Sequence, residues 1–273
     1  MLNTQQPVPP FTFMLALALI FVACAPAPTP VPPLEVTQPT ASATQPQPTA
    51  TLTPRPTPTT TNPALQAALE KIRGEYLKQM EASGFKPSWV PAIRIEYTPK
   101  LMYHHPGQRT IYVSDWANLS AEEKALFDQW ASFAAEGATG QSLFAEMFHW
   151  FFFPHEVGHD TQKQLQIESS GPYEVEYNAT EWAVAFWKTQ PGAEERVRRV
   201  ERAARRIWER LPNPVPAGQD SRAYFNENYT KGIISNTPAY GYFQFSFLMD
   251  IMDRRQELIF GAMVQAALKN QSK

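Results

Sequence analysis

Apolar side chains recur every three or four residues along most of the chain after residue 63. Leu65, Leu69, Ile72, Tyr76 and Met80 have this spacing and are followed by Gly84, which predicts a helix that ends there. The same periodicity predicts helices over 141–165, 173–188, 193–211 and 238–258, with more helix after the last. Ser120-Ala121-Glu122-Glu123 is a capping box that would open another helix, to about Gly137.

Two short runs have β character instead. Ala92–Tyr97 and Arg109–Val113 are rich in β-branched and aromatic residues, and a turn-rich piece with Pro106-Gly107 separates them. A small sheet or hairpin is therefore expected before the central helices. The fold class predicted is α+β and mainly α.

The predicted helix over 141–165 is apolar on nearly all sides, which places it in the middle of a domain. Pro154 lies inside it and should kink it, or restart it, just before His155.

The first 63 residues follow none of these patterns. Residues 11–23 form an uncharged apolar run that suits a signal peptide, and Cys24, the only cysteine, follows directly. Phe21-Val22-Ala23-Cys24 resembles the lipobox of bacterial lipoproteins. This resemblance implies that residues 1–23 are removed and that Cys24 is lipidated, giving an exported, membrane-anchored protein. The alternative is an uncleaved membrane anchor with an incidental cysteine.

Residues 24–63 are rich in proline and threonine, and twelve of the 26 prolines lie between residues 25 and 63. With few apolar or charged side chains, this segment is expected to be a disordered, semi-rigid spacer. Residues 64–273 are then left as one domain. A single cysteine excludes an intramolecular disulfide, so that domain must be held by its core alone or by its core together with a metal.

The charge pattern points to no nucleic-acid partner, because the formal net charge is −2. The arginines of residues 193–211 could contact an anionic membrane or polymer. The glutamates among them favour the solvated face of an amphipathic helix.

The chemistry is concentrated in His155-Glu156-Val157-Gly158-His159. On a helix, His155 and His159 stand one turn apart and can bind one zinc ion through nitrogens at about 2.0–2.1 Å. Glu156 could then take a proton from a water held by the metal and deliver it to a leaving amine. Gly158 is a poor helix former and indicates close packing at this point.

With this motif the sequence resembles the gluzincin branch of the zincin metallopeptidases. There a second helix carries Glu-x-x-x-Asp, whose Glu binds the metal and whose Asp supports a ligand histidine. The resemblance covers about residues 141–190 and implies that Glu174 is the third ligand, with Asn178 in the supporting position. Glu174, Asn178 and Glu181 share one helix face, so Glu181 and then Glu176 are the alternatives.

Family members often add a late histidine or tyrosine that binds the developing oxyanion. No histidine follows His159, so Tyr240 or Tyr242 is the candidate for this role, with core packing as the alternative. Of the other histidines, His104 and His105 are expected in an exposed loop and His149 in the core. Asp160 could be a surface charge or could support a ligand.

Three functions follow from these observations. The leading hypothesis is a zinc-dependent metallopeptidase acting on a peptide or protein. The second is an inactive zincin scaffold that serves as a binding module of the cell envelope. The third is an interaction module in which the motif is accidental.

Overall fold

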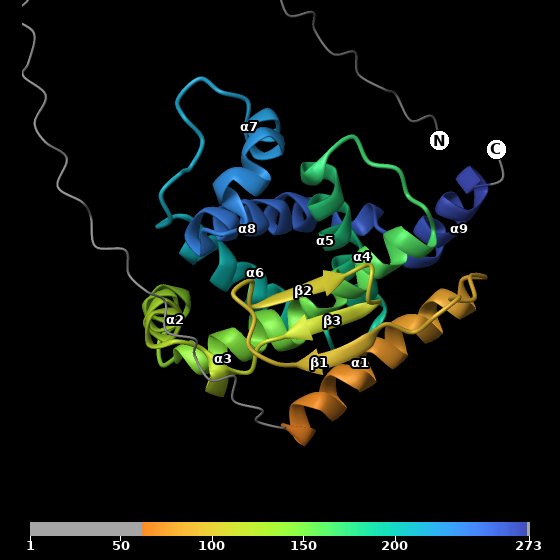
Figure 1. Cartoon of the computed structure of the whole chain (residues 1–273), viewed down its shortest axis with the longest axis horizontal. Coiled ribbons are helices and arrows are strands. Elements are labelled where there is room, and N and C mark those ends of the chain that lie inside the picture. Colours follow the sequence, from red (N-terminus) through yellow and green to blue (C-terminus); the bar gives the residue numbers. More distant parts are fainter. Residues whose placement is uncertain (1–61, 272–273) are drawn as a thin grey trace, which may run out of the picture. The chain divides into compact units, whose positions relative to one another are not determined.

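The computed structural model describes residues 62–271 (Figure 1). Its first helix, α1 (Pro63–Ala82), is capped by the Asn62 side chain, which accepts the Leu65 N–H. The sequence prediction for this helix is confirmed, because its buried residues are the five of the apolar stripe: Leu65, Leu69, Ile72, Tyr76 and Met80.

A three-stranded sheet follows α1, and it confirms the expected small β element. β1 (Ala92–Ile95) runs parallel to β3 (Thr110–Val113), and β2 (Met102–His105) runs antiparallel to β3 on its other side. The order is β1-β3-β2, so β3 is the buried central strand and β2 is an edge. β2 lies in the stretch that the sequence analysis assigned to a turn-rich connection.

A short turn, η1 (Trp116–Asn118), leads to α2 (Ala121–Ala134), whose capping box is formed by Ser120 and Glu123 as expected.

The predicted helix over 141–165 is divided in three. Then come α3 (Gly140–Phe144), a π-helical segment η2 (Ala145–Phe151) and α4 (Phe153–Gln164). Pro154 stands in the first turn of α4, so the predicted restart just before His155 is confirmed.

The C-terminal half is helical. The predicted helices correspond to α5 (Pro172–Thr189), α6 (Glu194–Trp208) and α8 (Thr237–Asp253), and α9 (Phe260–Gln271) follows the short turn η4 (Arg255–Glu257). The sequence analysis did not predict α7 (Ser221–Asn228) or the π-helical segment η3 (Tyr229–Ile233). The described part of the chain is thus mainly α with a small sheet.

Helix α4 holds the central position expected for it. It contacts α5 on one side and both α1 and β2 on the other, while α5 in turn packs against α8 (Figure 1). Nine of its residues are buried, among them His155 and Glu156. A helix in this place can bury such polar side chains without a large energetic cost only if they are hydrogen-bonded or paired.

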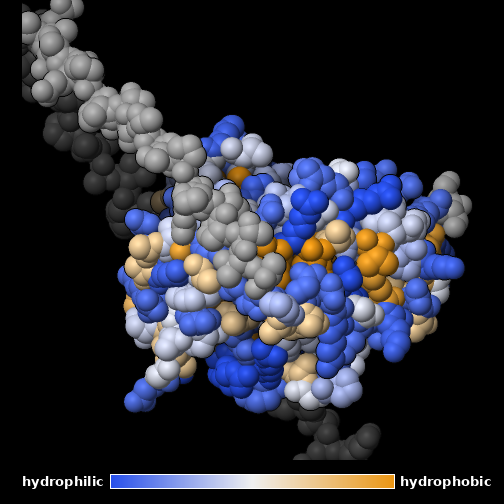
Figure 2. Space-filling view, turned by 60° about the horizontal axis from the view of Figure 1, so that its bottom comes forward, coloured by the Kyte–Doolittle hydropathy of each residue, from blue (hydrophilic) through white to orange (hydrophobic). Residues whose placement is uncertain are grey.

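The surface shown in Figure 2 is mostly hydrophilic, with separate hydrophobic areas between polar side chains. On α6 the arginines pair with glutamates, as in Arg198–Glu194 at 2.7 Å, which favours the solvated face expected there. No helix among residues 62–271 is both long and apolar enough to cross a membrane. The predicted signal peptide, Cys24 and most of the spacer lie outside the described residues.

Candidate metal centre

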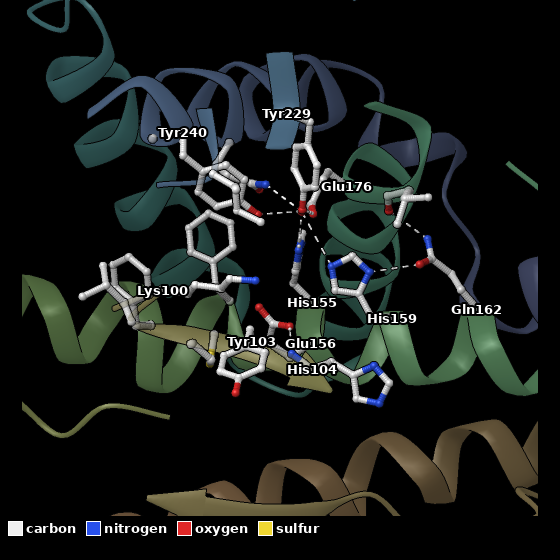
Figure 3. Close-up of a pocket in the computed structure, with 18 of the residues that line it drawn as sticks. Lys100, Tyr103, His104, His155, Glu156, His159, Gln162, Glu176, Tyr229 and Tyr240 are labelled. Carbon is white, nitrogen blue, oxygen red and sulfur yellow. Dashed lines mark hydrogen bonds and ion pairs between the residues drawn. The ribbon is translucent and has the colours of Figure 1, made fainter. Parts of the chain in front are cut away.

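The two histidines of the motif meet the same carboxylate. His155 Nε2 lies 3.2 Å and His159 Nε2 3.6 Å from Oε2 of Glu176 on α5. The three groups offer ligand atoms that all lie within 4.8 Å of one another (Figure 3). His155 and Glu176 are buried, and the His159 side chain is 16% exposed. Two imidazoles and one carboxylate are a donor set that zinc accepts, with one coordination position left over.

The close approach of α4 and α5 brings these groups together. A Cβ placed on Gly158 would stand 3.1 Å from Cβ of Trp182 and 3.2 Å from the carbonyl oxygen of Ala179, both on α5. Only glycine fits there without moving α5, which confirms the close packing expected at this residue. The contact fixes which face of α5 meets α4, and Glu176 is on that face.

Each histidine is oriented by a hydrogen bond to its second ring nitrogen. The Thr180 hydroxyl donates to the Glu176 carbonyl oxygen at 3.1 Å, so its oxygen accepts from Nδ1–H of His155 at 3.0 Å. Gln162 donates through Nε2 to the Val175 carbonyl, so its Oε1 accepts from Nδ1–H of His159 at 3.1 Å. Both rings therefore present an unprotonated Nε2 towards Glu176 when they are neutral.

Three further donors hold the Glu176 carboxylate. Tyr229 donates to Oε1 at 2.6 Å, while Tyr240 at 2.7 Å and Gln244 at 2.9 Å donate to Oε2. Figure 3 shows the two tyrosines on the Glu176 side of the histidines, with Glu156 and His104 on the other side. The carboxylate is fixed from two helical segments, η3 and α8, as well as from α4.

The electrostatics follow from this packing. Burial raises the pKa of Glu176, but the neighbouring His159 and His155 outweigh it and hold the pKa well below its usual value. Burial lowers the pKa of His159, but the charge of Glu176 outweighs it and raises the pKa to about 9. Burial and then the Glu176 charge raise the pKa of both Tyr229 and Tyr240, so both hydroxyls stay protonated as donors.

Glu156 lies beside this cluster with a partner of its own. Its side chain is buried, and its Oε2 accepts the backbone N–H of His104, on the edge strand β2, at 2.7 Å. The histidines, Glu156, Glu176 and Tyr240 all line one cavity of about 550 Å³. The far wall of that cavity is aromatic and includes Trp130, Phe148, Phe152 and Phe245.

The structure corrects the choice of third ligand. Glu174 is paired with Arg222 of α7, and Glu181 with Arg254, so neither reaches the histidines. Helical periodicity shows which glutamates share a face of α5, but not which face meets α4. The first turn of α5, with Glu174, faces α7, a helix the sequence did not reveal.

Two other expectations are also corrected. Thr180, rather than Asn178, contacts the His155 ring. Tyr242 is outside the cavity and stacks on Trp208 with ring centroids 5.3 Å apart, so of the two tyrosines only Tyr240 is at the site. No sequence pattern pointed to Tyr229 or Gln244, because η3 was not predicted and Gln244 lies in an apolar stretch.

The three remaining histidines lie outside the cluster of His155, His159 and Glu176. His149 is partly buried, its Nε2 donates to the Ser114 carbonyl at 2.8 Å, and burial lowers its pKa. His104 and His105 are in strand β2 and not in an exposed loop. The His104 side chain is only 3% exposed and lies against Asp160, which is also buried.

No model of a known protein family, no curated protein and no solved structure matches this chain. The argument for a function therefore rests on the geometry and chemistry of this centre.

Proposed function

We propose that this chain is a zinc-dependent metallopeptidase in which His155, His159 and Glu176 hold the metal. The observation that carries the proposal is the convergence of His155 Nε2, His159 Nε2 and Glu176 Oε2, with Glu156 buried beside them in the same cavity. A purely structural zinc site fills its fourth position with a protein ligand and has no use for a neighbouring carboxylate base. Among the described residues, the group that could hold a metal consists of these three side chains, so the fourth coordination position of zinc would be left open.

The bound zinc would supply a Lewis acid that lowers the pKa of water and polarises a substrate carbonyl. Glu156 would accept the proton of the attacking water and donate it to the leaving amine. Its carboxylate is already oriented, because the His104 N–H holds Oε2. The Tyr240 hydroxyl stays protonated and donates its one proton to Glu176, so it would serve a developing oxyanion only after releasing that hydrogen bond.

The cavity supports a peptide as the substrate class. Its polar side carries the histidines and glutamates, and its aromatic wall would accommodate a large apolar side chain next to the scissile bond. β2 also lines the cavity and is the edge of the sheet, where an extended chain can align.

The fit to the gluzincin pattern improves when the register is shifted by two residues. Glu176 and Thr180 then take the places of Glu and Asp in Glu-x-x-x-Asp, and Thr180 contacts His155 as a supporting residue should. For the part of the chain outside residues 62–271, we propose export and tethering to the membrane through a lipidated Cys24.

A second function is favoured by one observation. The Glu176 carboxylate accepts hydrogen bonds from Tyr229, Tyr240 and Gln244 and also contacts the histidines. Its hydrogen-bonding capacity is therefore filled, and the buried polar centre is complete as it stands. Such a centre would also suit an inactive scaffold that binds a partner at the cell envelope.

The Glu156→Gln variant separates these two functions. We expect it to bind as much zinc as the wild type and to lose peptide hydrolysis by about 10²- to 10⁴-fold, because the amide cannot shuttle a proton. Hydrolysis would be followed with a library of internally quenched peptides, and zinc content measured on the same samples. If wild type and variant both bind zinc and are equally inactive, the binding module is the better account.

A further inference from the structure

His104 is attached to helix α4 at two points, one through its main chain and one through its side chain. The main-chain N–H donates to Glu156 Oε2 at 2.7 Å, as Figure 3 shows. The ring Nε2 lies 3.2 Å from Oδ1 of Asp160, a close polar contact that does not have the geometry of a hydrogen bond. Glu156 and Asp160 are four residues apart, so the two attachments span one turn of α4.

The second attachment is buried and has a fixed partner. The side chains of His104 and Asp160 are 3% and 1% exposed, so solvent screens this pair little. Trp89 donates to Oδ1 of Asp160 at 2.8 Å, and Gln164 donates to its Oδ2 at 2.7 Å. The Asp160 carboxylate therefore cannot turn away from His104 without breaking one of these hydrogen bonds.

The strand that carries His104 needs such an attachment. β2 pairs with β3 on one side only, and it also contacts α4. Without the His104 side-chain contact, the His104 N–H would be held at Glu156 by the pairing of this edge strand with β3 and by its own hydrogen bond to Glu156. A shift of about 1 Å at a catalytic carboxylate can cost about 100-fold in rate.

We propose that Asp160 acts through the His104 ring as a positioning residue, which fixes the β2 backbone N–H on Glu156 and thereby orients that carboxylate. This inference rests on the proposed function for its catalytic meaning, but the contact itself needs neither metal nor substrate. It also assigns a role to the aspartate that directly follows the metal motif.

The test is hydrogen–deuterium exchange of the residue 104 amide, measured residue by residue by mass spectrometry on the full chain and corrected for intrinsic rates. In His104→Leu, which keeps the strand but loses the ring contact, exchange should speed up at least tenfold. In His104→Gln, the side-chain amide can still donate to Asp160, so exchange of the residue 104 backbone amide should return towards the wild-type rate. His105→Leu is the matched control, because it makes the same substitution on the next residue of β2, whose ring accepts from the Gln108 N–H and does not contact Asp160.

Unchanged exchange in His104→Leu, or an equal increase in His105→Leu, would overturn the positioning role. Where hydrolysis is detected, His104→Leu should lower kcat by about tenfold, with little change in KM and an unchanged zinc content. His104→Gln should restore kcat. If the wild type binds no zinc and hydrolyses nothing, the proposed function fails. The exchange result still decides whether Asp160 positions β2.

Discussion

At the scale of single residues, the candidate centre depends on groups whose hydrogen-bonding state is set by their neighbours. Thr180 gives its own proton to the Glu176 carbonyl and so leaves only an acceptor for His155. Gln162 does the same for His159 because its amide nitrogen is used by the Val175 carbonyl. The supporting residues thus decide which ring nitrogen faces the metal position.

Replacing Thr180 tests this directly. Thr180→Val keeps the volume but removes the acceptor for His155 Nδ1–H, so zinc affinity should fall by about 10- to 100-fold. Thr180→Ser should retain most of the affinity, because it keeps the hydroxyl. The measurement is competition with a zinc chelator. Asn178→Ala is the control on the same helix, and an equal loss in that variant would contradict the assignment of Thr180.

At the scale of elements, the contact between α4 and α5 decides which glutamate meets the two histidines. The sequence predicted both helices, their approximate limits and the close packing at Gly158. It could not predict the rotation of α5 about its axis, which depends on α7 and α8 as well as α4. Glu174 and Glu176 point to nearly opposite sides of a helix, about 160° apart, so the rotation of α5 about its axis decides which of them faces α4.

Gly158→Ala tests the packing of these two helices. An added Cβ would press on the Ala179 carbonyl and on Trp182 Cβ, so the metal-free protein should lose about 1–3 kcal/mol in its free energy of unfolding. Gly74→Ala is the matched control on α1, where nothing lies within 4 Å and alanine should stabilise by up to about 1 kcal/mol. Urea unfolding measures both, and stabilisation by both substitutions would show that α4 and α5 have room to spare.

At the scale of the whole molecule, the site is assembled from segments that are distant in the sequence. Strand β2 supplies the N–H for Glu156, α5 supplies Glu176, and η3 and α8 supply the tyrosines. The local motif on α4 was readable in the sequence because its spacing alone places two histidines together. Among its partners, Tyr240 was named only as one of two late tyrosines that the resemblance suggested, and those from η3 or from the edge strand were not predicted.

The measurement that tests the central claim most directly is the zinc content of the full chain, purified without a histidine tag. Wild type, Glu176→Ala, Glu174→Ala and His159→Ala would be compared after identical reconstitution. We predict near-stoichiometric zinc in the wild type and in Glu174→Ala, and its loss in Glu176→Ala and His159→Ala, because Glu176 and His159 lie in the cluster while Glu174 pairs with Arg222. A wild type without zinc, or a Glu176→Ala variant that keeps it, would contradict the account.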